Sequence, residues 1–223
     1  MNKVPLLIFD CDGVLVDSEL VSLGLLIDHC ADNGLLIDLN QACDCFLGKP
    51  VADAGAEASR MFKRPIPDVD LEIFQEAILD KFGTSLHPLD GIERALRLLV
   101  NPKCVASSSN LHRIKVSVDL TNLSSFFGEY YFSTDMVSKG KPHPDVFLYA
   151  CEKMGYEPAD ALVIEDSPAG LQAAKAAGIK TIAFTGGSHA PHANLRKKLQ
   201  KHSPDILIDH MWDLGFAIEQ LSL

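Results

Sequence analysis

The chain has 223 residues, of which 47% are hydrophobic and 22% are charged. This composition indicates one or two compact domains with a substantial core and excludes a disordered chain. The 20 Lys and Arg residues against 30 Asp and Glu residues give a formal net charge of −10, which argues against a nucleic-acid-binding protein.

The first predicted element is a short buried strand over residues 4–9, because this run is apolar. Asp10 and Asp12 follow it directly, in the segment Asp10-Cys11-Asp12-Gly13. In an open α/β sheet, ligands bind at the carboxyl ends of the strands. A pair of carboxylates at such a position could hold a divalent cation, attack a phosphorus atom or transfer a proton.

A helical block follows, and no strand is predicted between residues 17 and 83. Ser18 is expected to cap the first helix, which should end at Asn33-Gly34. Asp70 is expected to cap the last helix of the block, which Gly83 should close. Two more helices are predicted between them, over residues 39–47 and 50–62.

From residue 88 onward, apolar runs rich in β-formers alternate with amphipathic helical patterns. This alternation predicts a parallel sheet that is covered by helices on both faces. The first strand must join that sheet, so the helical block is an insertion with chain crossings near residues 13–17 and 83–91. The predicted strands cover residues 104–106, 130–132, 161–164, 181–184 and 206–208, and the predicted helices cover residues 91–100, 111–120, 145–154, 168–177 and 212–221.

Polar residues follow the predicted strands, and parallel strands would bring them to one crevice. Carboxylates at Asp10 and Asp166 would repel each other unless a cation lay between them, and Mg²⁺ suits such oxygen ligands. A lysine and a serine beside that cation would bind a phosphoryl group. Asp10 would then be the nucleophile that forms an aspartyl-phosphate, and Asp12 would be the acid to the leaving alcohol and the base to water. The other polar residues of these segments are Ser107, Ser108, Ser109, Asn110, Lys141 and Glu165.

Four segments resemble the motifs of the haloacid dehalogenase-like (HAD) hydrolases, in the order in which that family has them. The first is Asp10-x-Asp12-Gly13-x-Leu15-x-Asp17-Ser18, and the second is Ser107 after an apolar strand. The third is Lys141-Pro142-x-Pro144-Asp145, and the fourth is Glu165-Asp166-Ser167-x-x-Gly170. The inserted helical block resembles the mobile cap of the family.

The resemblance implies a fold and a role for each motif residue. The fold would be α/β, with a Rossmann-like parallel-sheet core over residues 1–14 and 88–223 and a small all-helical cap domain over residues 15–87. Asp10 would be the nucleophile and a ligand of Mg²⁺, and Asp12 would be the acid/base, whose backbone carbonyl also meets the metal. Ser107 and Lys141 would hold the phosphoryl oxygens, with Ser108 binding phosphate beside them. Asp166 would ligate the metal, and Glu165 would act on it through water.

The resemblance favours a Mg²⁺-dependent phosphatase that acts on a small phosphorylated metabolite. Dehalogenases and phosphonate-cleaving members of the family replace the second aspartate, which is present here as Asp12. A β-phosphoglucomutase-like sugar-phosphate mutase is the alternative, although Ser22 and Val51 stand where such mutases carry a cap histidine and a cap arginine. A non-catalytic phosphate-binding module is the third possibility, although no catalytic residue is lost. Sugar or sugar-acid phosphates, 6-phosphogluconate-like or phosphoglycolate-like, would fit, and Lys49 of the cap is a candidate to meet a second anionic group.

Other patterns have simpler explanations. Gly13 comes too early in its segment for a calcium-binding loop. His189 and His192 lie in a Gly-rich segment that indicates a flexible loop near the mouth of the site. The six cysteines match no disulfide or zinc spacing, and no secretory signal or membrane-length apolar run is found. We therefore expect reduced thiols and a cytoplasmic monomer with no membrane or nucleic-acid partner.

Overall fold

The computed structural model describes residues 4–222, and six parallel strands within this range form one sheet in the order β3-β2-β1-β4-β5-β6. The chain order reverses at β1, which pairs with β2 on one side and with β4 on the other. Residues 1–3 and 223, which were expected to belong to the core, lie outside the described residues. The strands are β1 Leu6–Phe9, β2 Lys103–Ser107, β3 Tyr131–Ser133, β4 Ala161–Glu165, β5 Lys180–Phe184 and β6 Ile206–Ile208.

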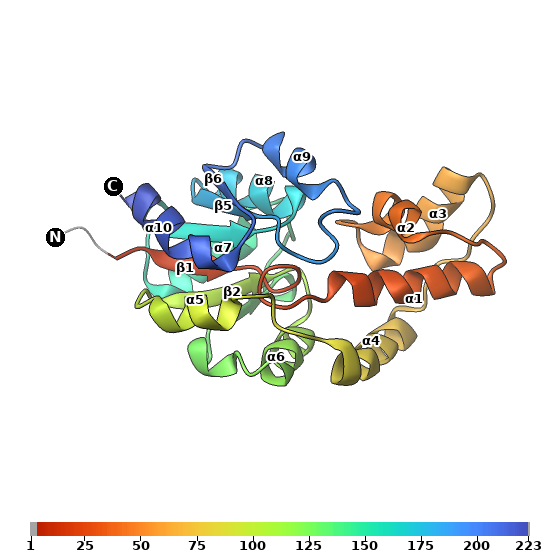
Figure 1. Cartoon of the computed structure of the whole chain (residues 1–223), viewed down its shortest axis with the longest axis horizontal. Coiled ribbons are helices and arrows are strands. Elements are labelled where there is room, and N and C mark those ends of the chain that lie inside the picture. The colour runs from red at the N-terminus through yellow and green to blue at the C-terminus, as the bar shows by residue number, and fades with distance from the viewer. Residues whose placement is uncertain (1–3, 223) are drawn as a thin grey trace.

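Helices cover both faces of this sheet, as the alternation of strands and helices predicts (Figure 1). Successive side chains of a strand point to opposite faces. Leu6 and Ile8 of β1 therefore pack with residues of α7 (Asp145–Met154) and α8 (Pro168–Ala176). Leu7 and Phe9 join a larger core on the other face, to which four further helices contribute: α5 Ile92–Leu98, α6 Leu111–Leu120, α9 Leu195–Gln200 and α10 Leu214–Ser222. The predicted α/β fold class is confirmed.

Four α-helices lie between β1 and α5, and they form the part of the molecule at the right of Figure 1. We call this part the cap. Its two connections to the sheet run side by side, because the Asp17 amide donates to the His87 carbonyl and the Leu89 amide donates to the Leu15 carbonyl, both at 2.9 Å. The domain boundaries predicted at 14/15 and 87/88 fall next to these hydrogen bonds and stay a prediction. The cap helices are α1 Glu19–Asp32, α2 Leu39–Phe46, α3 Ala54–Phe62 and α4 Leu71–Ser85.

The structure corrects three local predictions in the cap. Residues 51–53 form a 3₁₀ turn, so α3 begins at Ala54 rather than near Pro50. Helix α4 continues through Gly83 to Ser85, because Gly83 is not among the residues with a positive φ and so does not adopt the left-handed conformation that ends helices. Ser18 takes the N-cap position of α1, but its side chain makes no capping hydrogen bond.

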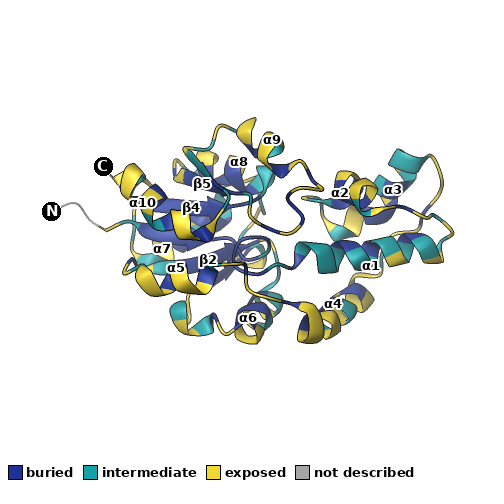
Figure 2. Cartoon of the chain, viewed as in Figure 1, coloured by how far each residue is buried: buried dark blue, intermediate teal, exposed yellow. Residues whose placement is uncertain are grey.

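Burial is deepest where the sheet lies between its helices, whereas the outer faces of the helices are exposed (Figure 2). All four residues of β1 are 0% exposed, as expected for a central parallel strand with both faces covered. Within residues 4–222, no helix has both the length and the apolar character needed to cross a bilayer.

Candidate active site

Three strand ends bring acidic and hydroxyl side chains together where the chain order of the sheet reverses. Asp10 follows β1, Ser107 ends β2, and Glu165 and Asp166 stand at the end of β4. Because β1 is paired with both β2 and β4, these residues are neighbours. Such a reversal point at the carboxyl ends of the strands is where open α/β sheets bind ligands.

Lys141 reaches this group from the segment before α7 and pairs with two of its carboxylates. Its Nζ donates to Asp10 Oδ1 at 2.7 Å, to Glu165 Oε1 at 2.6 Å and to the Ala106 carbonyl at 3.1 Å. Burial lowers the pKa of Lys141, but the charges of Asp10 and Glu165 outweigh burial and raise the pKa above its ordinary value. The lysine is therefore charged at neutral pH, although its side chain is only 3% exposed.

Asp10, Glu165 and Asp166 form a group of carboxylates that fits a divalent cation. One oxygen from each lies within 4.8 Å of the other two, and all three residues are buried. Burial raises the pKa of Asp10 to about 7 despite the opposing effect of Lys141, and burial together with the charge of Glu165 raises the pKa of Asp166 well above its ordinary value. Lys141 pairs with only two of these three carboxylates, so a bound cation would balance the remaining charge, and an all-oxygen donor set fits Mg²⁺.

Both oxygens of Glu165 are already engaged by groups of the chain. Oε1 accepts from Lys141, and Oε2 accepts from the Ser167 amide at 2.8 Å and from the Ser167 hydroxyl at 2.9 Å. Ser167 also caps α8, because its Oγ accepts from the Gly170 amide at 3.0 Å. A carboxylate fixed in this way suits contact with a metal through water better than direct ligation, which is the role expected for Glu165.

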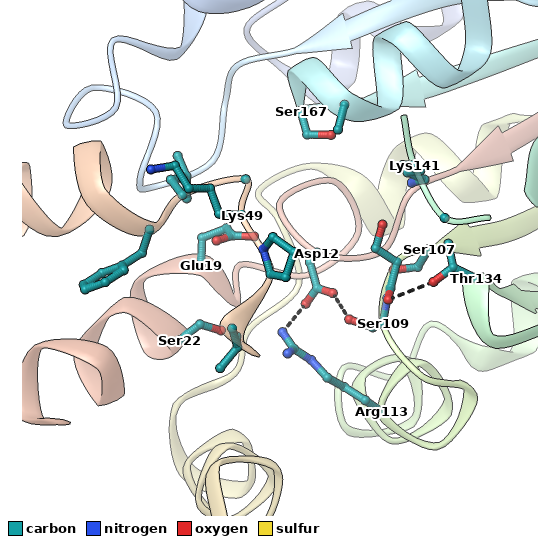
Figure 3. A pocket seen from close by; sticks show the side chains of 18 of the residues that line it. Asp12, Glu19, Ser22, Lys49, Ser107, Ser109, Arg113, Thr134, Lys141 and Ser167 are labelled. Atoms are coloured by element: carbon teal, nitrogen blue, oxygen red, sulfur yellow. Dashed lines mark hydrogen bonds and ion pairs between the residues drawn. The ribbon is translucent and has the colours of Figure 1, made fainter. Parts of the chain in front are cut away.

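The carboxylate of Asp12 lies in a separate hydrogen-bond network (Figure 3). Its Oδ2 accepts from the Ser109 hydroxyl at 2.6 Å, and its Oδ1 accepts from the Ser18 hydroxyl and from Arg113 Nη2, the latter at 2.8 Å. Burial raises the pKa of Asp12, but the charge of Arg113 and these hydrogen bonds outweigh burial and lower the pKa. The same network explains why the Ser18 hydroxyl does not cap α1.

The turn after β2 is held in place by residues at the end of β3. The Ser109 amide donates to Ser107 Oγ at 3.1 Å, and the Ser133 hydroxyl donates to the Ser109 carbonyl at 2.8 Å. The Thr134 hydroxyl donates to the Ser108 carbonyl at 3.2 Å. Residues 107–109, which include both predicted phosphate-binding serines, line one pocket together with Lys141.

That pocket has a volume of about 540 Å³ and lies between the strand ends and the cap. Its sheet side is polar, whereas its cap side is mostly apolar. Burial, together with the charge of Asp12, raises the pKa of Glu19, a polar exception on the cap side, to about 7. The other polar cap residues in the lining are Ser22, Lys49 and Gln75, and the apolar ones are Leu23, Leu26, Phe46, Leu47, Pro50, Val51, Leu71 and Phe74.

Lys49 lines the pocket, but its ammonium group is engaged by the cap itself. Its Nζ donates to the Cys45 carbonyl at 2.7 Å and to Glu57 Oε2 at 2.6 Å. Arg60 donates to the same oxygen of Glu57. A second anionic group of a substrate would therefore compete with Glu57 for Lys49, and the role expected for this lysine stays a prediction.

The loop that holds His189 and His192 packs against the site more closely than its sequence indicates. His189 is 1% exposed, and its Nε2 lies 3.4 Å from Asp166 Oδ2. Burial lowers the pKa of His189 to about 4, so the ring is neutral at pH 7. His192 is exposed, and its Nδ1 lies 3.1 Å from Asn40 Oδ1.

Two residues of the site, Arg113 and Glu19, are not predicted from the sequence. Arg113 stands in the first turn of α6, which starts four residues after Ser107, and Glu19 directly follows Ser18 of the first motif. The position of Arg113 gives a signal, because a helix that starts soon after a strand presents its first turn to the crevice, and the position of Glu19 gives one because Glu19 adjoins the first motif. A single charged residue in a helical first turn is nevertheless most often solvated, so the signal was too weak to select either residue.

Comparison with known proteins identifies related sequences. The family described as haloacid dehalogenase-like hydrolase matches residues 4–178. The chloroplastic protein SUPPRESSOR OF QUENCHING 1 of Arabidopsis thaliana is 34% identical over 190 residues, which cover 82% of this chain but only 18% of that protein. Validoxylamine A 7'-phosphate phosphatase of Streptomyces hygroscopicus subsp. limoneus is 30% identical over 190 residues, which cover 83% of this chain and 86% of that protein.

A solved structure shares the architecture along the whole chain. It is that of a conserved haloacid dehalogenase-like protein of unknown function from Agrobacterium tumefaciens str. C58, with a TM-score of 0.90 and 28% sequence identity. The match covers 99% of this chain and 100% of that chain. The similarity therefore includes the cap as well as the sheet.

Proposed function

We propose that this chain, which belongs to the haloacid dehalogenase-like hydrolases and is a phosphoric monoester hydrolase, is a Mg²⁺-dependent phosphatase of a small phosphorylated metabolite. In the proposed reaction, Asp10 carries the phosphoryl group. The observation that carries this proposal is the convergence of Asp10, Ser107 and Lys141 beside the carboxylates of Glu165 and Asp166. Together they supply a nucleophile, donors for phosphoryl oxygens and a set of metal ligands at one end of the pocket.

In the proposed reaction, a carboxylate oxygen of Asp10 attacks phosphorus, and the bond from phosphorus to the substrate oxygen breaks. Lys141 and Ser107 donate to the phosphoryl oxygens and oppose their negative charge. Asp12 gives a proton to the leaving oxygen and then takes one from the water that attacks phosphorus and releases Asp10.

The residues that would hold Mg²⁺ are Asp10, Asp166 and the backbone carbonyl of Asp12, with Glu165 acting through water. When bound, the ion would neutralise negative charge on the phosphoryl group. The excess of buried carboxylates over lysines supports this assignment.

For the substrate, we propose a sugar or sugar-acid phosphate, such as a 6-phosphogluconate-like or phosphoglycolate-like molecule. A pocket of about 540 Å³ has room for such a molecule, and Glu19, Ser22 and Gln75 offer hydrogen-bonding groups to its hydroxyls. The relative named for validoxylamine A 7'-phosphate supports a phosphorylated small molecule in general.

Hydrolysis is favoured over the mutase alternative by two residues of the pocket. Ser22 and Val51 both line it, at the positions where the mutase-like pattern has a histidine and an arginine. The pocket therefore lacks the cap arginine that would hold a second phosphate in the mutase pattern. We also propose a cytoplasmic monomer; the six unpaired cysteines among the described residues support the cytoplasmic location.

The proposal is tested by hydrolysis of p-nitrophenyl phosphate with and without Mg²⁺. We expect Mg²⁺-dependent release of phosphate that falls by more than about 10³-fold in Asp10→Asn, because an amide oxygen is a much weaker nucleophile than a carboxylate oxygen. Asp28→Asn, at an exposed position of α1, is the matched control and should keep its activity. Unchanged turnover in Asp10→Asn would overturn the proposed mechanism.

A further inference from the structure

The guanidinium group of Arg113 joins the proposed acid/base residue to the cap. Its Nη2 donates to Asp12 Oδ1 at 2.8 Å, and its Cζ lies 5.2 Å from the ring centroid of Phe82 in α4. Arg113 belongs to the sheet side of the pocket, through α6, whereas Phe82 belongs to the cap. Figure 3 shows the pair of Arg113 and Asp12. One side chain therefore contacts both the reacting group and the part of the molecule that would move over it.

The fold holds Arg113 in this position, so Arg113 is not a mobile arginine on the surface. Asn110 caps α6 by accepting from the Arg113 amide at 2.8 Å, which fixes the backbone of the first turn. The Arg113 side chain is 17% exposed and that of Asp12 is 13% exposed. Among the described residues, the buried Nε of Arg113 has no hydrogen-bond partner, while the guanidinium contacts Asp12 through Nη2 and lies over the face of Phe82.

The present contacts of Asp12 hold both of its oxygens. Oδ2 accepts from Ser109, and Oδ1 accepts from Ser18 and Arg113. To protonate a leaving oxygen, the Asp12 carboxyl group must release one of these contacts and turn toward the substrate. Because Arg113 packs on Phe82, a shift of α4 would move the guanidinium and alter its hydrogen bond to Asp12.

We propose that Arg113 is a positioning residue that couples the place of the cap to the orientation of Asp12 during protonation of the leaving group. The proposal rests on the proposed phosphatase function. In the step concerned, Asp10 forms a bond to phosphorus, the bond from phosphorus to the leaving oxygen breaks, and that oxygen takes the proton of the Asp12 carboxyl group. Arg113 touches neither phosphorus nor the leaving oxygen in this step.

The test compares two phosphate esters that differ in their need for that proton. p-Nitrophenolate leaves without protonation, whereas the alcohol of glycerol phosphate requires it. We expect Arg113→Gln to lower kcat/KM for glycerol phosphate by about 10-fold or more relative to its effect on p-nitrophenyl phosphate, since general acid catalysis contributes roughly 10² to 10⁴-fold. A merely structural role would lower both rates by the same factor.

A second variant and a matched control keep the test decisive. Phe82→Leu leaves Arg113 and Asp12 in place but removes the ring beneath the guanidinium, so the ratio of the two rates should shift in the same direction by a smaller factor. Arg97→Gln is the control, because Arg97 also pairs with a carboxylate, Glu93, and lies over a ring, Phe126, on the outside of the molecule. The ratio of kcat/KM for glycerol phosphate to kcat/KM for p-nitrophenyl phosphate should be the same in Arg97→Gln as in the wild type.

An unchanged ratio in both Arg113→Gln and Phe82→Leu would overturn the coupling. If thermal unfolding shows that Arg113→Gln does not fold, the ratio measured in Phe82→Leu decides alone. Failure of the proposed function has a different signature, because Asp10→Asn would then keep its turnover of p-nitrophenyl phosphate. An unchanged ratio together with an inactive Asp10→Asn would leave the phosphatase function in place and remove the role of Arg113.

Discussion

Asp10 and Asp12 stand two residues apart, yet their surroundings shift their pKa values in opposite directions. Burial raises the pKa of Asp10 to about 7, whereas the charge of Arg113 and serine hydroxyls lower the pKa of Asp12 in spite of its burial. Both proposed roles therefore need a change from this arrangement. A bound cation would favour the ionised form of Asp10, and Asp12 must take up a proton before it can act as the acid.

The raised pKa of Glu19 predicts how the stability of the protein depends on pH. Because its pKa is raised to about 7, the folded chain keeps the proton of Glu19 at pH values where the unfolded chain, with a pKa near 4.3, has lost it. The stability that Glu19 contributes is therefore complete below the unfolded pKa and is lost as the pH rises through about 7. Glu19→Gln has no charge to bury, so its advantage over the wild type in free energy of unfolding should grow by on the order of 1 kcal/mol between pH 5 and pH 8.

Chemical denaturation of both proteins at the two pH values measures this difference. Glu76→Gln, at an exposed position of α4, is the matched control and should show no growth of the gap. A gap between Glu19→Gln and the wild type that is equal at the two pH values, or that shrinks as the pH rises, would contradict the prediction.

At the scale of elements, the site is made by helices that start where strands end. Asn110 caps α6 shortly after β2, and Ser167 caps α8 directly after β4. Each cap fixes a first turn, and each first turn supplies or supports a site residue: Arg113 in α6, and Gly170, which lies against Glu165, in α8. The carboxyl ends of the strands thus position backbone and side chains together.

These elements could be predicted from the sequence because each carries a local signal. The apolar run before Asp10 and the alternation of strands and helices after residue 88 were enough to predict the sheet. The motif residues were enough to predict that Ser107, Lys141 and Asp166 lie together at one end of it. Local signals fail where distant groups compete. The sequence predicts that the Ser18 hydroxyl caps α1, but this hydroxyl donates to Asp12 instead. Which of the two hydrogen bonds forms depends on how α1 is placed relative to the end of β1.

Two helical glycines allow a matched prediction at the same scale. A Cβ at Gly170 of α8 would overlap the carboxylate of Glu165, whereas a Cβ at Gly24 of α1 would meet no atom within 4 Å. We expect Gly170→Ala to destabilise the protein by about 1–3 kcal/mol and to lower activity, because Glu165 must move and loosen Lys141. Gly24→Ala should stabilise the protein by up to about 1 kcal/mol, as alanine favours a helix.

Thermal and chemical unfolding of the two variants, with p-nitrophenyl phosphate turnover, checks this pair. The informative quantity is the difference between them, since both exchange a helical glycine for alanine. Equal stability and equal activity of the two variants would show that the space at Gly170 is not needed to hold Glu165.

At the scale of the whole molecule, the chain crosses between sheet and cap twice at one place. Val16 forms isolated bridges with Asp12 and with Pro88, so both crossings are tied to the first motif. The pocket lies between the two parts, and Arg113 with Phe82 forms a contact between them. A phosphatase must admit substrate and exclude bulk water during transfer of the phosphoryl group to the enzyme, and a cap on two adjacent connections is suited to that movement.

The central claim is that Asp10 takes up the phosphoryl group, and a crystal structure with Mg²⁺ and beryllium fluoride, a mimic of a phosphoryl group on a carboxylate, tests it most directly. We expect the beryllium to be bonded to an oxygen of Asp10, with its fluorines within hydrogen-bond distance of Ser107 and Lys141 and the metal held by Asp10 and Asp166. An adduct on any other side chain, or an Asp10 carboxylate turned away from the metal, would contradict the account.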